Sequence, residues 1–355
     1  MLVAGTRLLR IEPTAAGGGP CPAGPLPASG STARPVRGGR ECYPFRVAVI
    51  EVEGLRKEYR RRRRGNVVAL DSLDLSVPEG GVFGFLGPNG SGKTTTIRCL
   101  LGLARPTAGA CRVLGATSPH ELPRVIGSVG SLVETPGLFP SMSGRRNLAL
   151  LGRIDGIGRK AVQSVLERVG LAGRADDPVR GYSLGMRQRL GIAVALLKDP
   201  ELLVLDEPAN GLDPAGIKEV RELLRGLGGE GRTVFVSSHL LSEVQQTCDR
   251  VAILARGRCV RSGLVSDVLS SGRATGLVVR LAELDRGAAA LREAGLTAVV
   301  DGEVLRVALP ASEAATVTRV LAGRDLYLAE LRPEEVSLET VFLELTGESG
   351  DEGRR

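Results

Sequence analysis

The sequence predicts a mixed α/β fold for residues 46–265, followed by a smaller α+β unit. Within 46–265, short apolar runs alternate with longer stretches of helical periodicity, which is typical of layered α/β domains. A glycine-rich turn joins an apolar run to a helical stretch at residues 82–104, and four consecutive aliphatic residues at 202–205 suit a parallel strand covered on both faces. The length of 355 residues allows about two domains.

The two ends of the chain, residues 1–45 and 348–355, are predicted to be disordered. Positions 14–40 consist mainly of Gly, Pro, Ala, Ser and Arg, without any aromatic residue or periodicity. Much of the positive charge lies in the same region: residues 1–65 contain thirteen Arg and Lys but five Glu, whereas the whole chain has a net charge of +7. Because the excess is not spread over the folded body, the charge does not favour nucleic-acid binding.

The apolar runs of the sequence are all short. None approaches the roughly 18 residues that a membrane-spanning helix needs, and Arg7 and Arg10 interrupt the first thirteen residues, unlike the core of a secretory signal. We therefore expect a cytoplasmic protein. Five consecutive arginines at 60–64 are predicted to form a solvated loop before a strand at 67–70; attraction to acidic lipid headgroups is the alternative, and RNA binding is a third.

Residues 87–94 match the phosphate-loop pattern GxxxxGK[ST]. The loop follows an apolar strand at 82–86 and opens a helix that ends before Pro106, which is the context that this motif requires. Its glycines would let backbone N–H groups surround phosphates, Lys93 would reach the β- and γ-phosphates, and the Thr94 hydroxyl would bind Mg²⁺. The loop predicts a nucleoside triphosphatase, and its candidate nucleotide-binding residues are Gly87, Pro88, Asn89, Gly90, Ser91, Gly92, Lys93, Thr94 and Thr95.

Two carboxylates end the predicted buried strand at 202–205. Asp206 and Glu207 should emerge at the carboxyl end of this strand, where ligands bind in open α/β sheets. Asp206 is the candidate Mg²⁺ ligand, through water, and Glu207 is the candidate base that orients and deprotonates the attacking water, with Lys93 balancing phosphate charge. Taken alone, the Asp-Glu-Pro sequence could also be a polar turn.

Residues 182–190 (Tyr-Ser-Leu-Gly-Met-Arg-Gln-Arg-Leu) precede this strand and are similar to the signature sequence of ATP-binding cassette (ABC) ATPases. Two further segments follow in the order of that family: residues 210–213 (Asn-Gly-Leu-Asp) resemble its D-loop, and residues 237–239 (Ser-Ser-His) resemble its switch histidine. Tyr59 precedes a predicted strand in the position of the family's adenine-stacking aromatic residue. The resemblance covers about residues 47–265.

The resemblance implies a P-loop NTPase fold with a RecA-like core, a helical subdomain and an antiparallel β subdomain, and it implies ATP and Mg²⁺ as ligands. It also implies a head-to-tail homodimer in which Ser183 and Gly185 of one subunit close over ATP held by the other. His239 would contact the γ-phosphate, and Asp213 would join the nucleotide site. From the residues alone, Ser183 could be an ordinary helix cap, His239 a structural histidine and Tyr59 a core aromatic.

The sequence departs from the family at the Q-loop, whose glutamine falls on Glu134 by the spacing of residues 134–140. A glutamate keeps an oxygen that can face Mg²⁺ or the lytic water, but it adds a negative charge near phosphate. Glu134 is therefore a candidate nucleotide contact and a possible metal ligand. The change resembles a variant in some bacterial antibiotic-resistance exporters of the family.

Residues 266–347 are predicted to form an accessory α+β domain, with strands at 277–281, 297–300, 304–309 and 326–328 between Ala/Leu/Arg-rich helices. The last of these residues, 337–347 (Ser-Leu-Glu-Thr-Val-Phe-Leu-Glu-Leu-Thr-Gly), resemble the C-terminus of ATPase subunits that serve drug, antibiotic or polysaccharide exporters with separate permeases. The accessory domain could stabilise the dimer or regulate it.

The resemblance therefore implies the ATP-hydrolysing subunit of an ABC transporter, which powers a separately encoded, multi-span membrane permease. Such a subunit is peripheral on the inner face of the cell membrane, and the resemblance favours export of a drug, antibiotic or other amphiphile. We expect the coupling surface near residues 134–148. The alternative is a soluble regulatory ABC ATPase that acts on a cytosolic or nucleic-acid partner. The transported molecule is not predicted, because selectivity would reside in the permease.

Overall fold

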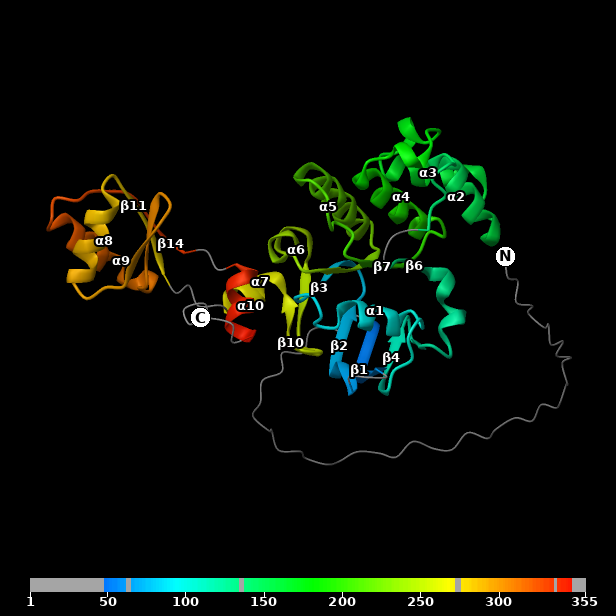
Figure 1. The fold of residues 1–355 in the computed structure, drawn as a ribbon, viewed down its shortest axis with the longest axis horizontal. Helices are drawn as coiled ribbons and strands as arrows, with labels where there is room; N and C mark the ends of the chain where they lie inside the picture. Colours follow the sequence, from blue (N-terminus) through cyan, green and yellow to red (C-terminus); the bar gives the residue numbers. More distant parts are fainter. Residues whose placement is uncertain (1–47, 62–64, 134–136, 272–275, 335–336, 347–355) are drawn as a thin grey trace, which may run out of the picture. The chain divides into compact units, whose positions relative to one another are not determined.

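The computed structural model describes residues 48–61, 65–133, 137–271, 276–334 and 337–346 (Figure 1). The predicted disordered ends at 1–45 and 348–355, the Q-loop residue Glu134 and residues 62–64 of the arginine run lie outside the described residues. Within those ranges, no helix has both the length and the apolar character needed to cross a membrane.

A six-stranded sheet forms the centre of the larger core, and all of its neighbouring strands pair in parallel except β9 and β10, which are antiparallel. The predicted strand at 202–205 is confirmed, with all four aliphatic side chains buried. Because β3, β7 and β8 are parallel neighbours, their carboxyl ends lie at one edge of the sheet. In spatial order the strands are β10 (Arg258–Leu264), β9 (Arg250–Ala255), β3 (Gly81–Leu86), β8 (Thr233–Ser238), β7 (Leu202–Asp206) and β6 (Val129–Leu132).

A second, antiparallel sheet packs over the first, with α1 (Lys93–Leu100) sharing their common core. Its strands are β2 (Gly65–Pro78), β1 (Ala48–Arg61), β4 (Ala108–Val113) and β5 (Ala116–Thr117). Strand β1 continues beyond the apolar run that ends at Val52, because its ladder with β2 reaches Arg61 opposite Gly65. Tyr59, Arg60 and the backbone of Arg61 are thus part of a strand, and the prediction that the arginine run begins in a loop is wrong.

Helices α2 (Gly144–Gly152), α3 (Arg159–Arg168) and α4 (Leu184–Leu196) form a subdomain next to β6 and β7 (Figure 1). The predicted apolar face of α4 is buried in this subdomain around Leu190 and Ala193. Helices α5 (Pro214–Gly229) and α6 (Leu241–Thr247) follow β7 and β8. Single-turn helices lie at Leu122–Arg124, Ile126–Ser128, Arg153–Asp155, Ala172–Arg174, Val179–Gly181 and Ala311–Glu313.

Residues 277–333 form a four-stranded antiparallel sheet with two helices, in the chain order β-α-β-β-α-β. This chain order and the strand order β12-β13-β11-β14 are those of a ferredoxin-like fold. One face of β11, formed by Leu277, Val279 and Leu281, is buried in a hydrophobic cluster. The same cluster contains Leu291 of the first helix and Leu321 of the second. The elements are β11 (Leu277–Leu281), α8 (Leu284–Glu293), β12 (Ala298–Asp301), β13 (Val304–Val307), α9 (Ala314–Ala322) and β14 (Leu328–Pro333).

The strand predicted at 277–281 is confirmed with the same bounds, and those predicted at 297–300 and 304–309 are confirmed as β12 and β13 with slightly different bounds. The fourth begins at Leu328 and runs to Pro333 instead of covering 326–328. In its ladder with β11, Leu277 lies opposite Pro333. This pairing extends the strand through charged residues that the apolar pattern does not include.

Two helices flank residues 277–333 in the chain, and both contribute side chains to the larger core. These are α7 (Val265–Ser271) and α10 (Leu338–Thr346). Val268 from α7, with Leu338 and Phe342 from α10, is buried in the same cluster as side chains of β8 and α6. The division of the chain at residue 265 stays a prediction. Among the described residues, the core of the ferredoxin-like unit contains buried side chains of residues 277–326 and none from α7 or α10.

Candidate nucleotide site

The phosphate loop turns from β3 into α1 through glycines whose conformations other residues rarely adopt. Gly90 has φ +82° and Gly92, which precedes the first residue of α1, has φ +112°. A Cβ atom on Gly92 would lie 2.7 Å from the carbonyl oxygen of Ala69, and one on Gly87 would lie 2.4 Å from the carbonyl oxygen of Leu254. The loop therefore packs closely on the strands beneath it, and the start of α1 provides N–H groups and a positive dipole end for phosphate.

Lys93 is the first residue of α1, and its ammonium group lies against the loop. Its Nζ donates to the carbonyl oxygen of Gly87 at 2.6 Å and to that of Pro88 at 3.3 Å. The same atom lies 3.3 Å from Oε1 of Glu207, and the Lys93 side chain is only 6% exposed. The structure thus brings together two predicted catalytic residues that are far apart in the sequence.

His239 contacts the other oxygen of the same carboxylate. Its Nδ1 lies 2.8 Å from Glu207 Oε2, and its backbone N–H donates to that atom at 3.3 Å. The Glu207 carboxylate therefore lies between the Lys93 ammonium and the His239 ring. A carboxylate held in this way can orient a water molecule and accept its proton, so the geometry suits general-base chemistry. The individual roles of the three residues stay predictions.

Glu207 has an unusual backbone conformation. Its φ of +50° is in the left-handed region, which costs about 1–2 kcal/mol for a residue with a side chain. Its N–H donates to the Ser237 carbonyl oxygen at 3.2 Å and to Ser237 Oγ at 3.0 Å, which holds the turn against β8. Strain of this kind gathers at functional sites, so it supports the candidate role of Glu207.

Ser237 is a residue of the site that sequence reasoning does not single out. In the sequence it stands at the start of the segment that ends at His239, yet in the structure its hydroxyl links both carboxylate residues. It donates to Asp206 Oδ1 at 2.5 Å and accepts from the Glu207 N–H, and the residue is fully buried at the end of β8. The only sequence signal for this role is that Ser237 is a polar residue at the end of a buried strand. Its contact with Asp206 can be inferred only once β7 and β8 are known to be neighbours.

The candidate Mg²⁺ ligands offer a chemically suitable donor set. Asp206 ends β7 with a partly buried carboxylate, and Thr94 lies in the first turn of α1, next to Thr95. Carboxylate and hydroxyl oxygens are ligands that Mg²⁺ accepts beside water and phosphate. Glu134, the remaining candidate ligand, lies outside the described residues.

Three other predicted residues lie at helix starts. Ser183 is exposed and caps α4, since its Oγ accepts from the Met186 N–H at 3.2 Å; the cap predicted from the residues alone is thus confirmed. Asp213 caps α5 by accepting from the Gly216 N–H at 3.2 Å. Gly185 is partly exposed in the first turn of α4. Their contacts with ATP held by a second subunit stay predictions.

Tyr59 lies near the end of β1 and is partly exposed, so it is not a fully buried core aromatic. The ammonium of Lys57 lies 5.0 Å from the centroid of its ring, within the range of a cation–π contact. A partly exposed ring on this strand has a face that can stack on a base, although stacking on adenine stays a prediction.

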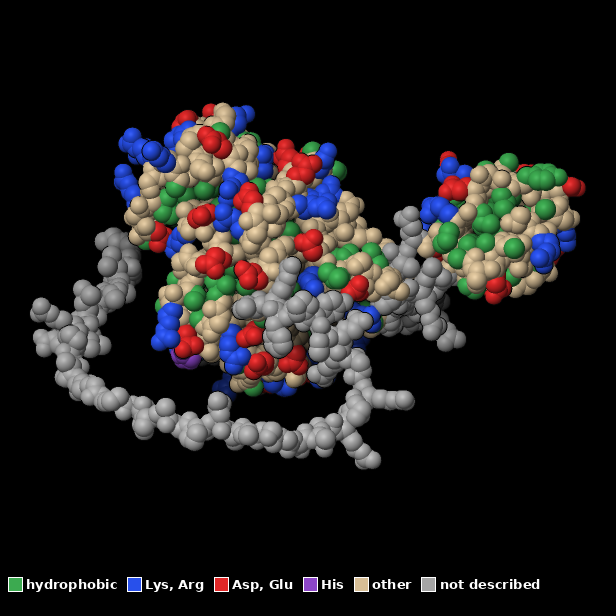
Figure 2. Space-filling view, turned by 180° about the vertical axis from the view of Figure 1, so that it is seen from behind, with side chains coloured by type: hydrophobic (Ala, Val, Ile, Leu, Met, Phe, Trp, Pro, Cys, Tyr) green, Lys and Arg blue, Asp and Glu red, His purple; other side chains and the backbone are tan. Residues whose placement is uncertain are grey.

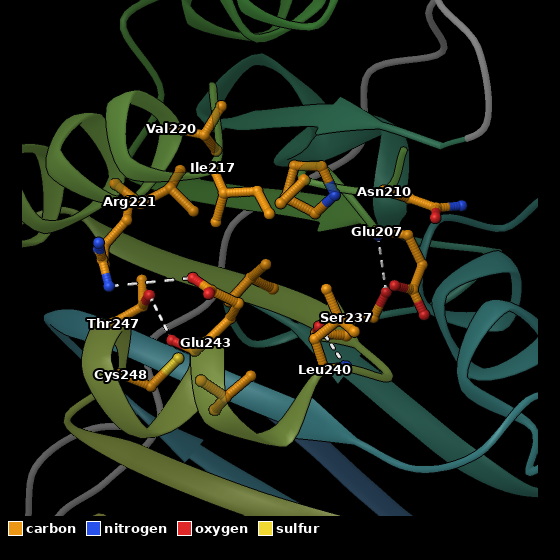
Figure 3. A pocket seen from close by; sticks show the side chains of 16 residues that line it. Glu207, Asn210, Ile217, Val220, Arg221, Ser237, Leu240, Glu243, Thr247 and Cys248 are labelled. Atoms are coloured by element: carbon orange, nitrogen blue, oxygen red, sulfur yellow. Dashed lines mark hydrogen bonds and ion pairs between the residues drawn. The ribbon is translucent and has the colours of Figure 1, made fainter. Parts of the chain in front are cut away.

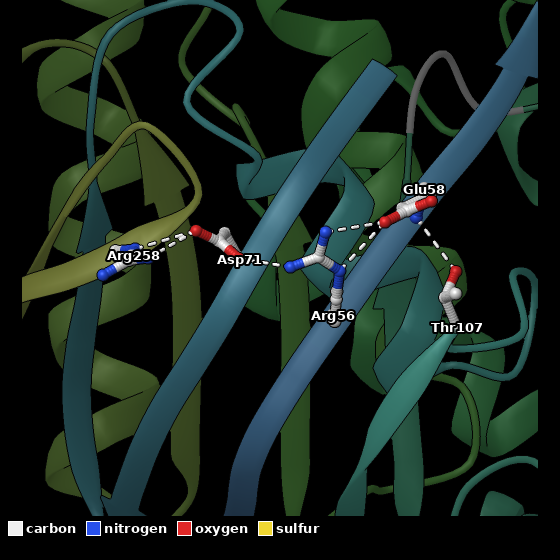
Figure 4. A network of polar contacts seen from close by, with 5 residues as sticks. All are labelled: Arg56, Glu58, Asp71, Thr107 and Arg258. Atoms are coloured by element: carbon white, nitrogen blue, oxygen red, sulfur yellow. Dashed lines mark hydrogen bonds and ion pairs between the residues drawn. The ribbon is translucent and has the colours of Figure 1, made fainter. Parts of the chain in front are cut away.

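An ion-pair network joins the strand of Tyr59 to the central sheet (Figure 4). Asp71 on β2 accepts from Arg56 on β1 at 2.7 Å and from Arg258 on β10 at 2.5 Å. Arg56 also donates to Glu58, whose N–H donates to Thr107 Oγ1 at 2.9 Å. The hydrogen bond from Arg258 is the largest of the causes that hold the pKa of Asp71 below its ordinary value.

A small apolar cavity of about 30 Å³ lies beside Glu207, which is one of the residues that line it (Figure 3). Asn210 lines it from the loop after β7, Ile217 from α5, and Val244 and Cys248 from α6 and its end. Burial raises the pKa of the Cys248 thiol. Helix α6, which begins two residues after His239, is thus bordered by free space on the side that faces α5.

Comparisons with known proteins agree with this geometry. A family model described as "ABC transporter" matches residues 70–210. The uncharacterised ABC transporter ATP-binding protein YhcH of Bacillus subtilis (strain 168) is 40% identical over 306 residues, which cover 86% of this chain and 98% of that protein. The chain belongs to the family of ABC transporter ATP-binding proteins.

Other members of the family resemble this ABC protein over similar lengths. The bacitracin transport ATP-binding protein BcrA of Enterococcus faecalis is 36% identical over 312 residues, covering 85% of this chain and 97% of that protein. The structure of cbiO1 from Clostridium perfringens, part of the ABC transporter complex cbiONQ, superposes with a TM-score of 0.56 at 28% identity and covers 63% of this chain and 91% of that one. The predicted fold is therefore confirmed, and this ABC protein is an ATPase that binds nucleotide.

Proposed function

We propose that this ABC protein acts as a homodimer that hydrolyses Mg·ATP to power a separately encoded membrane permease, and that the transported molecule is an antibiotic, drug or other amphiphile leaving the cell. The relatives support the class of cargo, since BcrA is described as a bacitracin transport protein. The protein would work at the inner face of the cell membrane, through its contact with the permease.

The observation that carries the chemical part of the proposal is the position of the Glu207 carboxylate between Lys93 and His239. Mg²⁺ would neutralise phosphate charge, with the Thr94 hydroxyl and the Asp206 carboxylate as its protein ligands. Glu207 would orient the attacking water and accept its proton, while Lys93 would balance charge on the phosphates. Ser183 of a second copy would close the site.

A groove of about 330 Å³ supports contact with a permease. It is lined by apolar side chains from β6, from the segment before α2, and from α2 and α4, among them Leu132, Leu138, Leu151 and Val194. Leu103, which also lines the groove, is 67% exposed. Part of this lining falls within the segment 134–148 where the coupling surface is predicted, and an apolar groove suits an amphipathic helix of a membrane protein.

The distribution of charge does not support nucleic acid as the partner. Figure 2 shows Lys and Arg side chains interspersed with Asp and Glu over the visible face of the larger core, without a continuous basic surface among the residues drawn in colour. A surface that binds a phosphate backbone needs clustered positive charge. The experiment below therefore distinguishes the transporter subunit from the alternative, a soluble regulatory ATPase.

The test is co-purification from membranes of the Glu207→Gln variant, with and without Mg·ATP. Loss of the base should trap the ATP-bound dimer, so a multi-span permease should be recovered in larger amounts with nucleotide. Leu103→Glu, which places a charge on the groove, should abolish recovery of the permease, whereas Val299→Glu on the exposed edge strand of the ferredoxin-like unit should not. A trapped soluble dimer without any membrane partner would support the regulatory ATPase instead.

A further inference from the structure

The C-terminal helix α10 packs into the core that supports the nucleotide site. Leu338, Val341 and Phe342 are 0%, 3% and 7% exposed, and they share a hydrophobic cluster with Val244 of α6 and Val268 of α7. The N–H of Thr340 donates to the hydroxyl of the residue before the helix, Ser337, at 3.1 Å. Three buried apolar side chains on a helix of nine residues provide a substantial hydrophobic anchor.

Helix α10 is also joined to α6 by a hydrogen bond. The Leu338 N–H donates to Oε1 of Gln245 at 3.1 Å. Helix α6 begins at Leu241, two residues after His239, and the Leu240 N–H between them donates to Ser238 Oγ at 3.0 Å. Because so short a connection has little freedom, the position of α6 limits where the backbone of His239 can lie relative to Glu207.

The opposite side of α6 faces α5 through a polar contact and a cavity. Arg221 of α5 donates a hydrogen bond to Oε1 of Gln246 on α6. There the cavity of about 30 Å³ separates part of α6 from α5 (Figure 3), and Oε2 of Glu243 is buried without a hydrogen-bond partner among the described residues. The guanidinium of Arg221, on α5, lies 4.0 Å from that oxygen. The free space beside this polar contact leaves room for α6 to move, and the packing of α10 on its other side limits that movement.

We propose that α10 is a positioning element for ATP hydrolysis: Phe342 and Leu338, acting through α6, hold His239 against Glu207. This inference rests on the proposed roles of His239 and Glu207. Residues 277–333 lie between α7 and α10 in the chain, so the ferredoxin-like unit is connected directly to the helix that supports the site. A partner that binds the ferredoxin-like unit and displaces α10 would lower hydrolysis without touching the nucleotide.

The test compares steady-state ATP hydrolysis in variants of the full chain. Phe342→Ala should lower kcat by about 10- to 100-fold, as expected when a catalytic group is misplaced by about 1 Å, with KM for ATP changed less than about two-fold. Phe342→Leu, which refills most of the volume, should restore kcat. Glu339→Ala, at an exposed position of the same helix, is the matched control.

Gln245→Ala provides a second variant that removes the hydrogen bond to Leu338 and leaves the apolar contacts in place, in case Phe342→Ala does not fold. It should lower kcat in the same direction, and amide hydrogen exchange of residues 241–247 should become faster in both variants. Equal kcat in wild type, Phe342→Ala and Gln245→Ala would overturn the inference. His239→Ala separates this failure from a wrong site assignment: if that variant also keeps full kcat, the proposed role of His239 is wrong.

Discussion

The backbone N–H of Gly257 donates to the carbonyl oxygen of Ser91 at 2.9 Å, and this bond ties the turn between β9 and β10 to the phosphate loop. The Gly257 carbonyl oxygen in turn accepts from the Asp71 N–H at 3.0 Å. Gly257 has φ +76°, and a Cβ there would lie 2.8 Å from the Ala69 carbonyl oxygen. The phosphate loop therefore depends on a turn that is distant in the sequence.

Substitution of Gly257 should weaken nucleotide binding. Gly257→Ala would combine a left-handed conformation with a clash against β2, so we expect a loss of stability of about 1–3 kcal/mol and a raised Kd for ATP. Gly231→Ala is the matched control, since Gly231 has φ +90° but open space around its Cβ position. Thermal unfolding and nucleotide titration measure both effects, and equal behaviour of the two variants would contradict the prediction.

The Asp71 ion pairs should make stability depend on acid pH. They lower the pKa of Asp71 from its ordinary 3.8, with the hydrogen bond from Arg258 as the largest cause. A lowered pKa means that the folded state binds the proton less tightly than the unfolded state. The stabilisation that these ion pairs give the folded state is therefore present above about pH 4 and is lost as the pH falls through the pKa of Asp71 in the folded state. The Tm difference between wild type and Asp71→Asn should be constant at neutral pH and shrink below about pH 4; an unchanged difference in more acid solution would argue against it.

Ser237 should influence the affinity for Mg²⁺ although it is not itself a predicted ligand. Its hydroxyl orients the Asp206 carboxylate, and loss of a residue that orients a metal ligand typically costs about 10- to 100-fold in metal affinity. Ser237→Ala should therefore raise the Mg²⁺ concentration needed for half-maximal hydrolysis by about that factor. Thr233→Ala, at the other end of β8 and likewise buried, is the control, and an equal rise in both variants would point to a general weakening of the strand.

The local motifs of the site could be predicted because each is contained within a few consecutive residues. The phosphate loop with Lys93, the strand that ends at Asp206 and the Ser183 cap of α4 follow from spacing and periodicity alone. The ABC fold is implied by the resemblance of the ordered motifs to those of the ABC family, and the relatives and solved structures confirm it.

The contacts that support the site could not be predicted, because they join residues whose proximity depends on sheet order. Ser237 reaches Asp206 only because β7 and β8 are neighbours, and Gly257 reaches Ser91 only because β9 lies beside β3. The length of β1 escapes prediction for a similar reason: its charged end is stabilised by the ladder with β2, which local composition does not show.

The buried cysteines should be unreactive in the native protein. Burial raises the pKa of Cys99 to about 11 and raises that of Cys248 as well, and both side chains are buried. The thiolate is the nucleophile, and at about pH 8 roughly one Cys99 thiol in a thousand would be ionised. Iodoacetamide should therefore modify these two residues far more slowly in the native protein than in guanidinium chloride, as measured by mass spectrometry of peptides. Native modification of Cys248 at the denatured rate would mean that α6 opens readily, which would also weaken the case that α10 limits its movement.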